Sequence, residues 1–346
     1  MQLKHIYWFG YYNNSVPSVR YRALIPLHQL HIERNITYDF VYPSYRLKQI
    51  LHFIKIYFSV YFDRKPDAII VFQKIYTKGI YARLLKLLLK KQPHFTIYDI
   101  DDAEYVRRPV ETIHHLMLHC NCCTVGSNTL KTYAEKFNEK VYLLTSPVAI
   151  HQQIKLKRNA VFTIGWIGYF GAHYENFRTY ILPIIAKLTF PVRLVILGIT
   201  QVEQQDLLNK EFASHKHITL IAPLNINWFN EIAIYNEIVQ FDIGIAPLLD
   251  TEFNRAKSAY KMKQYLSCGI PVLASPVGEN LRFLQDGVNG FLCNSATDFY
   301  DKIVYMHNLS DFEYTNMSSA ARAGLSEFST DQYIDALIHV SENLLS

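Results

Sequence analysis

The feature that most limits the folds open to this chain is a regular alternation of short apolar runs with helix-length segments. In the first half, strand-like runs occupy residues 4–9, 37–41, 68–72, 95–100, 122–125 and 141–144. Helical patterns lie between them at 19–33, 44–62, 74–91, 110–119 and 128–137. Because near-continuous apolar strands alternating with helices are typical of parallel sheets covered on both faces, the pattern predicts a doubly wound α/β unit.

The same alternation begins again in the second half, with strand-like runs at 162–167, 192–197, 218–221, 243–246, 271–274 and 290–292. A polar stretch without apolar periodicity separates the two series. We therefore predict four parts: a Rossmann-like domain at 1–150, a linker at 151–160, a second Rossmann-like domain at 161–326, and a C-terminal helix at 327–346 that packs back on the first domain.

Length and composition agree with two hydrophobic cores, since the 346 residues are 50% hydrophobic and only 19% charged. The first ten residues lack the pattern of a secretory signal, and the apolar segment 50–62 is too short and too polar to span a bilayer. We expect a cytoplasmic protein. The five cysteines include the cluster Cys120, Cys122 and Cys123, which is too closely spaced for a disulfide framework and predicts reduced core thiols.

The net charge of +5 is unevenly distributed along the chain. Residues 43–91 hold eleven Lys and Arg against two acidic residues, a local charge of +9. Two helical patterns with interleaved aromatic residues lie in this segment, so it fits peripheral contact with an anionic membrane, while a solvated basic face is the alternative. No nucleic-acid-binding module accompanies the charge, so we expect no nucleic-acid partner.

In the first predicted domain, the loop after the first strand contains Gly10, Asn14 and Ser15, and Arg20 follows it. Small polar residues at a strand end allow backbone N–H groups to approach a phosphate or a sugar. We interpret these four residues as a candidate acceptor or phosphate loop, with a plain connecting loop as the alternative. The loop has no GxGxxG pattern, so nothing here supports a nicotinamide cofactor.

In the second predicted domain, residues 165–171 (GWIGYFG) place Gly168 and Gly171 at a turn between strand and helix, where a nucleotide diphosphate can approach closely. Further on, Lys257, Lys261 and Gln264 fall at i, i+4 and i+7, so the spacing predicts one stripe of a helix that begins near Lys257. Two ammonium groups near a helix N-terminus would oppose the charge of a leaving diphosphate. A solvated basic face is the alternative, and Lys263 is expected to point to solvent.

Residues 241–292 (FDIGIAPLLDTEFNRAKSAYKMKQYLSCGIPVLASPVGENLRFLQDGVNGFL) resemble the donor-binding core of the group 1, or family 4, glycosyltransferases, which have the GT-B fold. GWIG at 165–168 is similar to the first donor-domain strand of that family. Four earlier segments look like the acceptor domain of a subgroup: SVRYRALIPL (18–27), YDIDDAEY (98–105), CTVGSNTLKTYA (123–134) and VYLLTSPV (141–148).

The resemblance implies transfer of a sugar from a nucleotide-sugar donor to a saccharide or lipid-linked acceptor, in surface polysaccharide or glycolipid biosynthesis. It also implies retention of anomeric configuration, no obligatory metal ion and no cofactor. The donor site that it implies comprises Lys257 and Lys261 at the diphosphate, Gln264 at the ribose, Pro223 near the base, Gly168, Tyr169, Phe170 and Gly171 on the phosphate side, and Gly278, Glu279 and Asn280 at the sugar.

One departure from the family pattern weakens the implied activity. Many relatives carry two glutamates eight positions apart, whereas Ala256 and Gln264 stand at these two places here. Glu252 and Glu279 are the nearby carboxylates that could substitute. A catalytically degenerate protein that binds nucleotide-sugars on the same fold is therefore the alternative function.

Asp99, Asp101 and Asp102 lie at the end of the fourth strand and have three interpretations. A DxD sequence holds a divalent cation in the other transferase fold, GT-A. As part of an acceptor-domain loop, Asp101 or Asp102 would instead orient the acceptor hydroxyl or take its proton, which makes them catalytic candidates. The third interpretation is a cap of the following turn. A zinc site at His115, His119 and the neighbouring cysteines is disfavoured, because no second ligand pair accompanies them.

Overall fold

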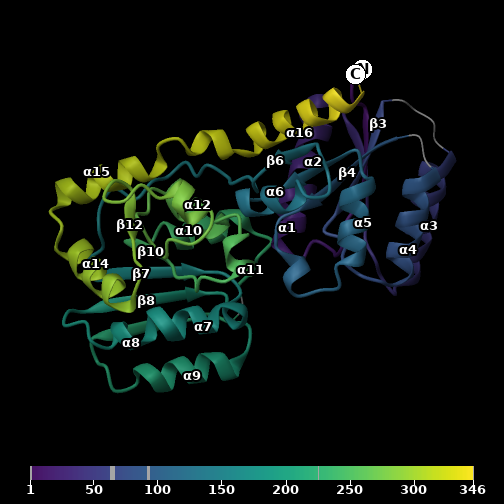
Figure 1. Cartoon of the computed structure of the whole chain (residues 1–346). Coiled ribbons are helices and arrows are strands. Elements are labelled where there is room, and N and C mark those ends of the chain that lie inside the picture. Colours follow the sequence, from purple (N-terminus) through teal and green to yellow (C-terminus); the bar gives the residue numbers. More distant parts are fainter. Residues whose placement is uncertain (1, 63–66, 92–93, 225, 346) are drawn as a thin grey trace. The chain divides into compact units, whose positions relative to one another are not determined.

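The computed structural model describes residues 2–62, 67–91, 94–224 and 226–345, which form two compact units (Figure 1). The first unit consists of Met1–Pro147, Arg255–Ser258 and Phe328–Ser346, and the second of Val148–Asn254 and Ala259–Glu327. The stretch that we expected as a linker thus belongs to the second unit, where the Lys155 amide donates to the Cys268 carbonyl at 2.8 Å.

A six-stranded parallel sheet with the order β2-β1-β3-β4-β5-β6 forms the first unit. Its registers are regular, with β1 aligned from His5 opposite Ala68 to Phe9 opposite Phe72. The strands are β1 His5–Phe9, β2 Thr37–Val41, β3 Ala68–Gln73, β4 Phe95–Ile100, β5 Cys122–Val125 and β6 Val141–Leu143.

Two helices far apart in sequence share a core with this sheet. Leu27 and Leu30 of α2 pack in one apolar cluster with Tyr333, Ile334 and Leu337 of α16, together with strand residues. The C-terminal helix therefore belongs to the first unit, as the sequence predicts (Figure 1). The helices of this unit are α1 Pro17–Val19, the π-helical turn Arg20–Leu24, α2 Ile25–Arg34, α3 Leu47–Phe62, α4 Ile80–Lys91, a 3-10 turn Glu104–Val106, α5 Glu111–His119, α6 Asn128–Ala134 and α16 Thr330–Leu345.

The second unit holds another six-stranded parallel sheet, with the order β12-β11-β10-β7-β8-β9 that is typical of Rossmann folds. Two strand glycines admit large aromatic rings: a Cβ on Gly165 would lie 1.9 Å from the Phe241 ring, and one on Gly244 would lie 2.4 Å from the Tyr265 ring. The strands are β7 Phe162–Ile167, β8 Val192–Leu197, β9 Ile218–Ile221, β10 Ile243–Ala246, β11 Val272–Ala274 and β12 Gly290–Leu292.

Helices of the second unit complete its core around Trp166, Phe170 and Phe177, all of which are buried. Ser295 and Ser310 each cap a helix and form a capping box with the acidic residue three positions later. The remaining elements are α7 Phe170–Tyr180, α8 Leu182–Ile185, α9 Val202–Phe212, α10 Glu231–Ile238, α11 Glu252–Arg255, α12 Tyr260–Ser267, α13 Asn280–Phe283, α14 Ala296–Asn308, α15 Asp311–Arg322 and a 3-10 turn Leu325–Phe328.

All twelve predicted strands are present, within one residue at each end. Helix starts agree less well: the pattern at 19–33 divides into α1, a π-helical turn and α2, and the helix expected from residue 74 begins at Ile80. The five cysteines are free and buried, as predicted. None of the helices in the described part of the chain has the length and apolar character needed to cross a membrane.

Candidate functional site

Strand order indicates where each sheet binds ligands. Ligands of open parallel sheets bind beyond the carboxyl ends of the strands, where the strand order reverses. In the second sheet this point lies between β7 and β10, and in the first sheet between β1 and β3. The loops at Gly168, Leu248, Gly10 and Lys74 follow these four strands closely. Gly168 and Gly10 are predicted site residues, whereas Leu248 and Lys74 are not.

Gly168 and Lys261 come together after β7. Gly168 has φ +149°, a conformation that favours glycine, and a Cβ at this position would lie 2.4 Å from Cε of Lys261. The Lys261 ammonium also lies 5.1 Å from the centroid of the Trp166 ring. Gly168 and Lys261 are thus neighbours within the second unit, as one shared phosphate site would require.

Helix α12 holds Lys261 in this place through Tyr265, one turn further along. The Tyr265 hydroxyl accepts a hydrogen bond of 2.8 Å from the backbone amide of Ile167, immediately before Gly168. The Tyr265 ring fills the space above Gly244, and Met262 is fully buried. Because α12 is attached to the end of β7, the lysine is positioned by packing and by a buried hydrogen bond.

A buried polar chain continues from Lys261. Its ammonium lies 2.8 Å from Nε2 of His173, and Nδ1 of that ring lies 3.0 Å from the side-chain amide nitrogen of Asn176. The Asn176 oxygen accepts a hydrogen bond of 2.8 Å from the Leu249 amide, in the loop after β10. This chain links α12 and α7 to the β10 loop, so His173 is a positioning residue that the sequence analysis missed.

The other predicted phosphate-side residues divide by burial. Phe170 is in the core and its amide donates to the Gly198 carbonyl at 3.1 Å, whereas Tyr169 and Gly171 are exposed. A Cβ on Gly198 would lie 1.5 Å from the Gly168 carbonyl oxygen. The ends of β7 and β8 can therefore approach this closely only because residue 198 is a glycine.

The predicted sugar loop after β11 is ordered by its own hydrogen bonds. Gly278 has φ +57°, and the Asn280 side chain donates to the Ser275 carbonyl at 2.9 Å. Glu279 is buried and lies 3.3 Å from Arg282. Of the two carboxylates that could substitute for the missing family glutamate, Glu279 is thus the buried one, while Glu252 is exposed.

Three other predicted positions differ in their surroundings. Gln264 lies on α12 with Lys261, and its side chain is buried. Pro223 is exposed, and the carbonyl of the preceding Ala222 accepts a hydrogen bond of 2.6 Å from Gln205. The expectation that Lys263 points to solvent is wrong: its side chain is fully buried, with the ammonium 5.2 Å from the Phe283 ring, because this face of α12 packs against α13.

Lys257 does not lie on the helix that the spacing predicts. Ala259 adopts a left-handed conformation, φ 50°, and α12 begins only at Tyr260, so Lys257 and Lys261 share no helical stripe. The segment Arg255–Ser258 packs within the first unit, where Ser127 Oγ donates to the Ala256 carbonyl at 2.7 Å. The Lys257 ammonium lies 3.8 Å from a carboxylate oxygen of Asp102.

In the first unit, Arg20 organises the loop after β1. Its guanidinium donates to the carbonyls of Asn14 and Ser15 at 2.8 and 3.0 Å. The Tyr81 hydroxyl donates to the Gly10 carbonyl at 3.0 Å. All four predicted loop residues therefore take part in one ordered loop, and Arg20 acts on its backbone.

The main charged cluster of the first unit surrounds Lys74, directly after β3. Its ammonium forms a hydrogen bond to Asp102 and lies 3.3 Å from both Asp101 and Glu104. Lys74 is 4% exposed and has φ +53°. Strained backbone conformations are found mainly at functional sites, so the strain at Lys74 and its three carboxylate neighbours mark this cluster as a candidate site.

Burial and these neighbours shift the pKa values in opposite directions. Burial raises the pKa of Asp101, and Lys74 opposes this shift. Burial would also raise the pKa of Asp102, but Lys74 and Lys257 outweigh it and hold that pKa well below its usual range. Burial would lower the pKa of Lys74, which the carboxylates instead raise well above its usual value. Two adjacent carboxyl groups with divergent pKa values suit proton transfer.

Asp99 has a different role from its two neighbours. The Arg22 guanidinium binds both of its carboxylate oxygens, with Nε 3.0 Å from Oδ2, and Thr124 donates to it at 2.7 Å. All three aspartates thus face cations of the chain itself, an arrangement unlike the GT-A cation site. Ala103, and not an aspartate, is the N-cap of the following 3-10 turn, so the capping interpretation is wrong.

The described residues contain no group of three or more His, Cys, Asp or Glu side chains arranged to hold a metal ion. The rings of His115 and His119 lie 4.4 Å apart between centroids and are tilted by 57°, and burial raises the pKa of Cys120, Cys122 and Cys123. Buried thiols with raised pKa values remain protonated and inert.

The two parallel sheets and their strand orders define the class of protein. The chain has the GT-B fold, in which two Rossmann-like domains each carry a parallel sheet. Residues 145–308 match the family model described as Glycosyl transferases group 1. The matched segment contains Gly168, Lys261 and Glu279, and it supports the resemblance to the group 1 glycosyltransferases.

Solved structures of glycosyltransferases share the fold over the full length of the chain. Sucrose-phosphate synthase from Thermosynechococcus elongatus has a TM-score of 0.70 at 12% identity and covers 99% of each chain. A glycosyltransferase from Rickettsia africae has a TM-score of 0.69 at 14% identity, and the match covers 100% of each chain. Anabaena HepE in complex with UDP has a TM-score of 0.68 at 12% identity, and the match covers 99% of this chain and 100% of the HepE chain. No curated protein is significantly similar in sequence to this chain.

Proposed function

We propose that this protein is a glycosyltransferase that moves a sugar from a nucleotide-sugar donor to a saccharide or lipid-linked acceptor. The observation that carries the proposal is the contact between Gly168 and Lys261 at the strand-order reversal of the second sheet, inside the group 1 domain. A glycine at φ +149° gives a phosphate access to the backbone, and the fixed ammonium supplies the charge that a departing diphosphate needs. Solved structures with the same fold contain UDP or UDP-glucose.

The donor site proposed for this chain adds the other residues of the same sheet edge. Gln264 is assigned to the ribose, Glu279 and Asn280 to the sugar, and the loop 168–171 to the phosphates, while the backbone before Pro223 is assigned to the base. Lys257 is proposed as a second cation for the diphosphate. The match of residues 145–308 to the group 1 model supports these assignments, because all of these residues lie within it.

Asp101 and Asp102 are the proposed acceptor-side residues. Asp102 is ionised and bonded to Lys74, whereas Asp101 is the carboxyl group with a raised pKa beside it. A carboxylate held by a buried lysine can orient an acceptor hydroxyl without itself being protonated. We further propose, from the family resemblance, that transfer proceeds with retention of configuration and without a metal ion or cofactor. Lys74 already faces Asp101 and Asp102, the carboxylates of the DxD sequence.

The proposed setting is the synthesis of surface polysaccharide or glycolipid, with α3 and α4 in contact with an anionic membrane. Seven large apolar side chains of α3 are exposed, namely Leu47, Ile50, Leu51, Ile54, Phe58, Tyr61 and Phe62. Lys48 and Lys55 on the same helix are exposed too. Exposed apolar and basic side chains on one amphipathic helix fit binding at a lipid headgroup interface.

Turnover of nucleotide-sugars tests the proposal. The protein is incubated with UDP-, GDP-, ADP-, CDP- and dTDP-linked sugars, and release of the nucleoside diphosphate is measured. Lys261→Ala should lower kcat/KM for the accepted donor by about 10²-fold, as loss of one fixed charge at a developing anion does. Lys210→Ala, on the exposed part of α9, is the matched control and should have no effect. Near-normal turnover by Lys261→Ala would contradict the assigned role.

A degenerate nucleotide-sugar-binding protein is the second candidate, and one observation favours it. Ala256 stands where relatives carry a glutamate, it is fully buried, and its carbonyl is bonded to Ser127. Nothing at that position supplies a carboxylate. Binding of a nucleotide-sugar without turnover in the same assay, with any acceptor, would support this candidate over the enzyme.

A further inference from the structure

A basic cavity lies between α4 and α5 in the first unit, apart from every residue assigned to the proposed reaction. Its volume is about 260 Å³. The residues that line it are Lys78, Ala82, Arg83, Lys86, Glu111 and Thr112. Three cationic side chains thus share a small cavity with a single carboxylate.

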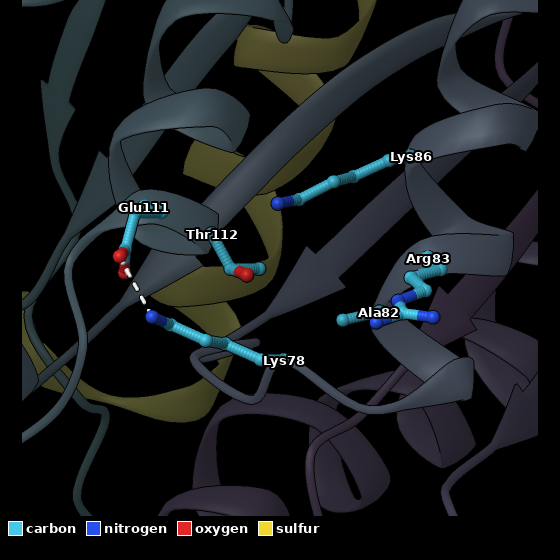
Figure 2. A pocket seen from close by; sticks show the side chains of 6 residues that line it. All are labelled: Lys78, Ala82, Arg83, Lys86, Glu111 and Thr112. Carbon is cyan, nitrogen blue, oxygen red and sulfur yellow. Dashed lines mark hydrogen bonds and ion pairs between the residues drawn. The ribbon is translucent and has the colours of Figure 1, made fainter.

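The side chains converge from two helices and from the loop before α4 (Figure 2). Lys86 extends from α4 toward α5, and the Lys78 ammonium reaches the Glu111 carboxylate at 2.7 Å. Arg83 lies on α4, one turn before Lys86. Within the described ranges, the side chains of Arg83 and Lys86 take part in no hydrogen bond or ion pair, so both cations can bind an added anion.

The environment of Lys86 also suits an anion. Burial lowers the pKa of Lys86, Glu111 opposes this shift, and the neighbouring Lys78 adds to it. An anion bound between the two ammonium groups would favour their charged forms. The positive charge in the cavity therefore exceeds the negative charge, and a bound anion would balance it.

Both helices present their first turns to the cavity. Ala82 lies in the first turn of α4, which begins at Ile80, and Glu111 and Thr112 open α5. The first turns of helices carry backbone N–H groups without partners in the helix and the positive end of its dipole. Two such ends beside three cations add to the preference for negative charge.

We propose that this cavity binds a phosphate group, with Arg83 and Lys86 as its direct contacts and Lys78 as a third cation that Glu111 partly neutralises. The group is a phosphate monoester carried either by a lipid headgroup or by a soluble metabolite, since both present the same chemistry. The proposal goes beyond the proposed transfer reaction, because it involves no donor-site residue and neither Asp101 nor Asp102.

Two probes separate the possible sources. Glycerol 3-phosphate, measured by calorimetry, represents the soluble ester. Vesicles of phosphatidylcholine with a minor fraction of phosphatidic acid, measured by co-sedimentation, represent the lipid, with phosphatidylserine at equal charge as the comparison. Binding of either phosphate monoester supports the cavity, and preference for phosphatidic acid over phosphatidylserine identifies the lipid as its source.

Substitutions of opposite sign test the cavity itself. Lys86→Gln should weaken the binding of the effective probe about tenfold, the loss expected for one charge-assisted hydrogen bond. Glu111→Gln should strengthen it, because the competing carboxylate is removed. Lys210→Gln makes the same charge change on the exposed surface of α9, outside the cavity and outside α3 and α4, and should leave it unchanged. Each variant is first required to keep the melting temperature of the wild type.

Three results would overturn the proposal. The first is no binding of either probe by the wild-type protein. The second is an equal loss with Lys86→Gln and Lys210→Gln, which would indicate attraction by general charge alone. The third is weaker binding by Glu111→Gln than by the wild type.

Discussion

Gly168 and Lys261 depend on each other at the scale of single residues. The glycine has a backbone conformation that other residues rarely adopt, and the space where its Cβ would stand is filled by the lysine side chain. The Lys261 side chain can therefore occupy its position only because residue 168 has no side chain. Spacing and resemblance identified both residues, but only the structure shows that they touch.

Gly168→Ala should lower both stability and donor turnover. The strained conformation costs on the order of 1–3 kcal/mol, and the new methyl group displaces Lys261. Thermal unfolding and nucleoside diphosphate release measure the two effects. Gly79→Ala is the control, because a Cβ there meets nothing within 4 Å, and it should leave both quantities close to those of the wild type. Unchanged turnover by Gly168→Ala would contradict the contact.

Lys74→Met should destabilise the first unit, because it leaves Asp101 buried without its cation and leaves Asp102 with Lys257 alone. Removing one partner of a buried ion pair costs about 3–5 kcal/mol at neutral pH. In the wild type, Asp102 has a lowered pKa, so its contribution is present above its unfolded pKa and lost as the pH falls through the folded value. In the variant, burial raises the pKa of Asp101 without Lys74 to oppose it, so stability is lost as the pH rises through that pKa.

The variant should therefore regain stability relative to the wild type when the pH is lowered toward about 5, which urea unfolding at several pH values measures. Lys78→Met is the control, since Lys78 and Glu111 form an exposed pair, and it should show a smaller loss without this pH trend. If the loss of unfolding free energy in Lys74→Met stays constant or grows at lower pH, the result would argue against the ion-pair cluster around Lys74.

Lys74 and His173 illustrate which site residues a single sequence conceals. Both act through partners that are 27 or more positions away, as with Lys74 and Asp101 or His173 and Lys261. No local pattern marks such contacts. The position of Lys74 directly after a strand was the one available signal, and the predicted helix at 74–91 obscured it.

At the scale of elements, α12 shows the limit of helical periodicity. The spacing of Lys257, Lys261 and Gln264 fits one face of a helix, but Ala259 is left-handed and the helix begins after it. Alanine is a strong helix former, so its presence gave no warning. Buried parallel strands were predicted more accurately, because each is a near-continuous apolar run bounded by polar residues.

Helix α3 should bind anionic vesicles through its exposed apolar side chains. The double variant Leu51→Asp and Phe58→Asp should weaken binding to vesicles containing phosphatidylserine by at least about tenfold, since two large apolar groups no longer enter the interface. Co-sedimentation measures the change. Ile232→Asp, a similarly exposed aliphatic position on α10, should bind as the wild type does. Equal binding by all three proteins would favour a merely solvated face.

At the scale of the whole molecule, the sequence reasoning recovered the GT-B fold. Two series of six apolar runs predict two sheets, and the helix Thr330–Leu345 lies where its pattern places it. The partition into units was harder to predict: the segments Arg255–Ser258 and Phe328–Ser346 belong with the first sheet through contacts distant in sequence. Such contacts leave no periodic signal, which is why a boundary drawn from composition alone misses them.

The measurement that tests the central claim most directly is protection against thermal unfolding by UDP, GDP, ADP, CDP and dTDP in the presence of a chelator. A ligand that binds only the folded state stabilises it by about 2.7 kcal/mol at a hundredfold excess over its Kd. We predict that one nucleotide raises the Tm of the wild type, that the chelator does not abolish the shift, and that Lys261→Ala diminishes it. No shift with any nucleotide, or a shift that Lys261→Ala leaves intact, would contradict the donor site described here.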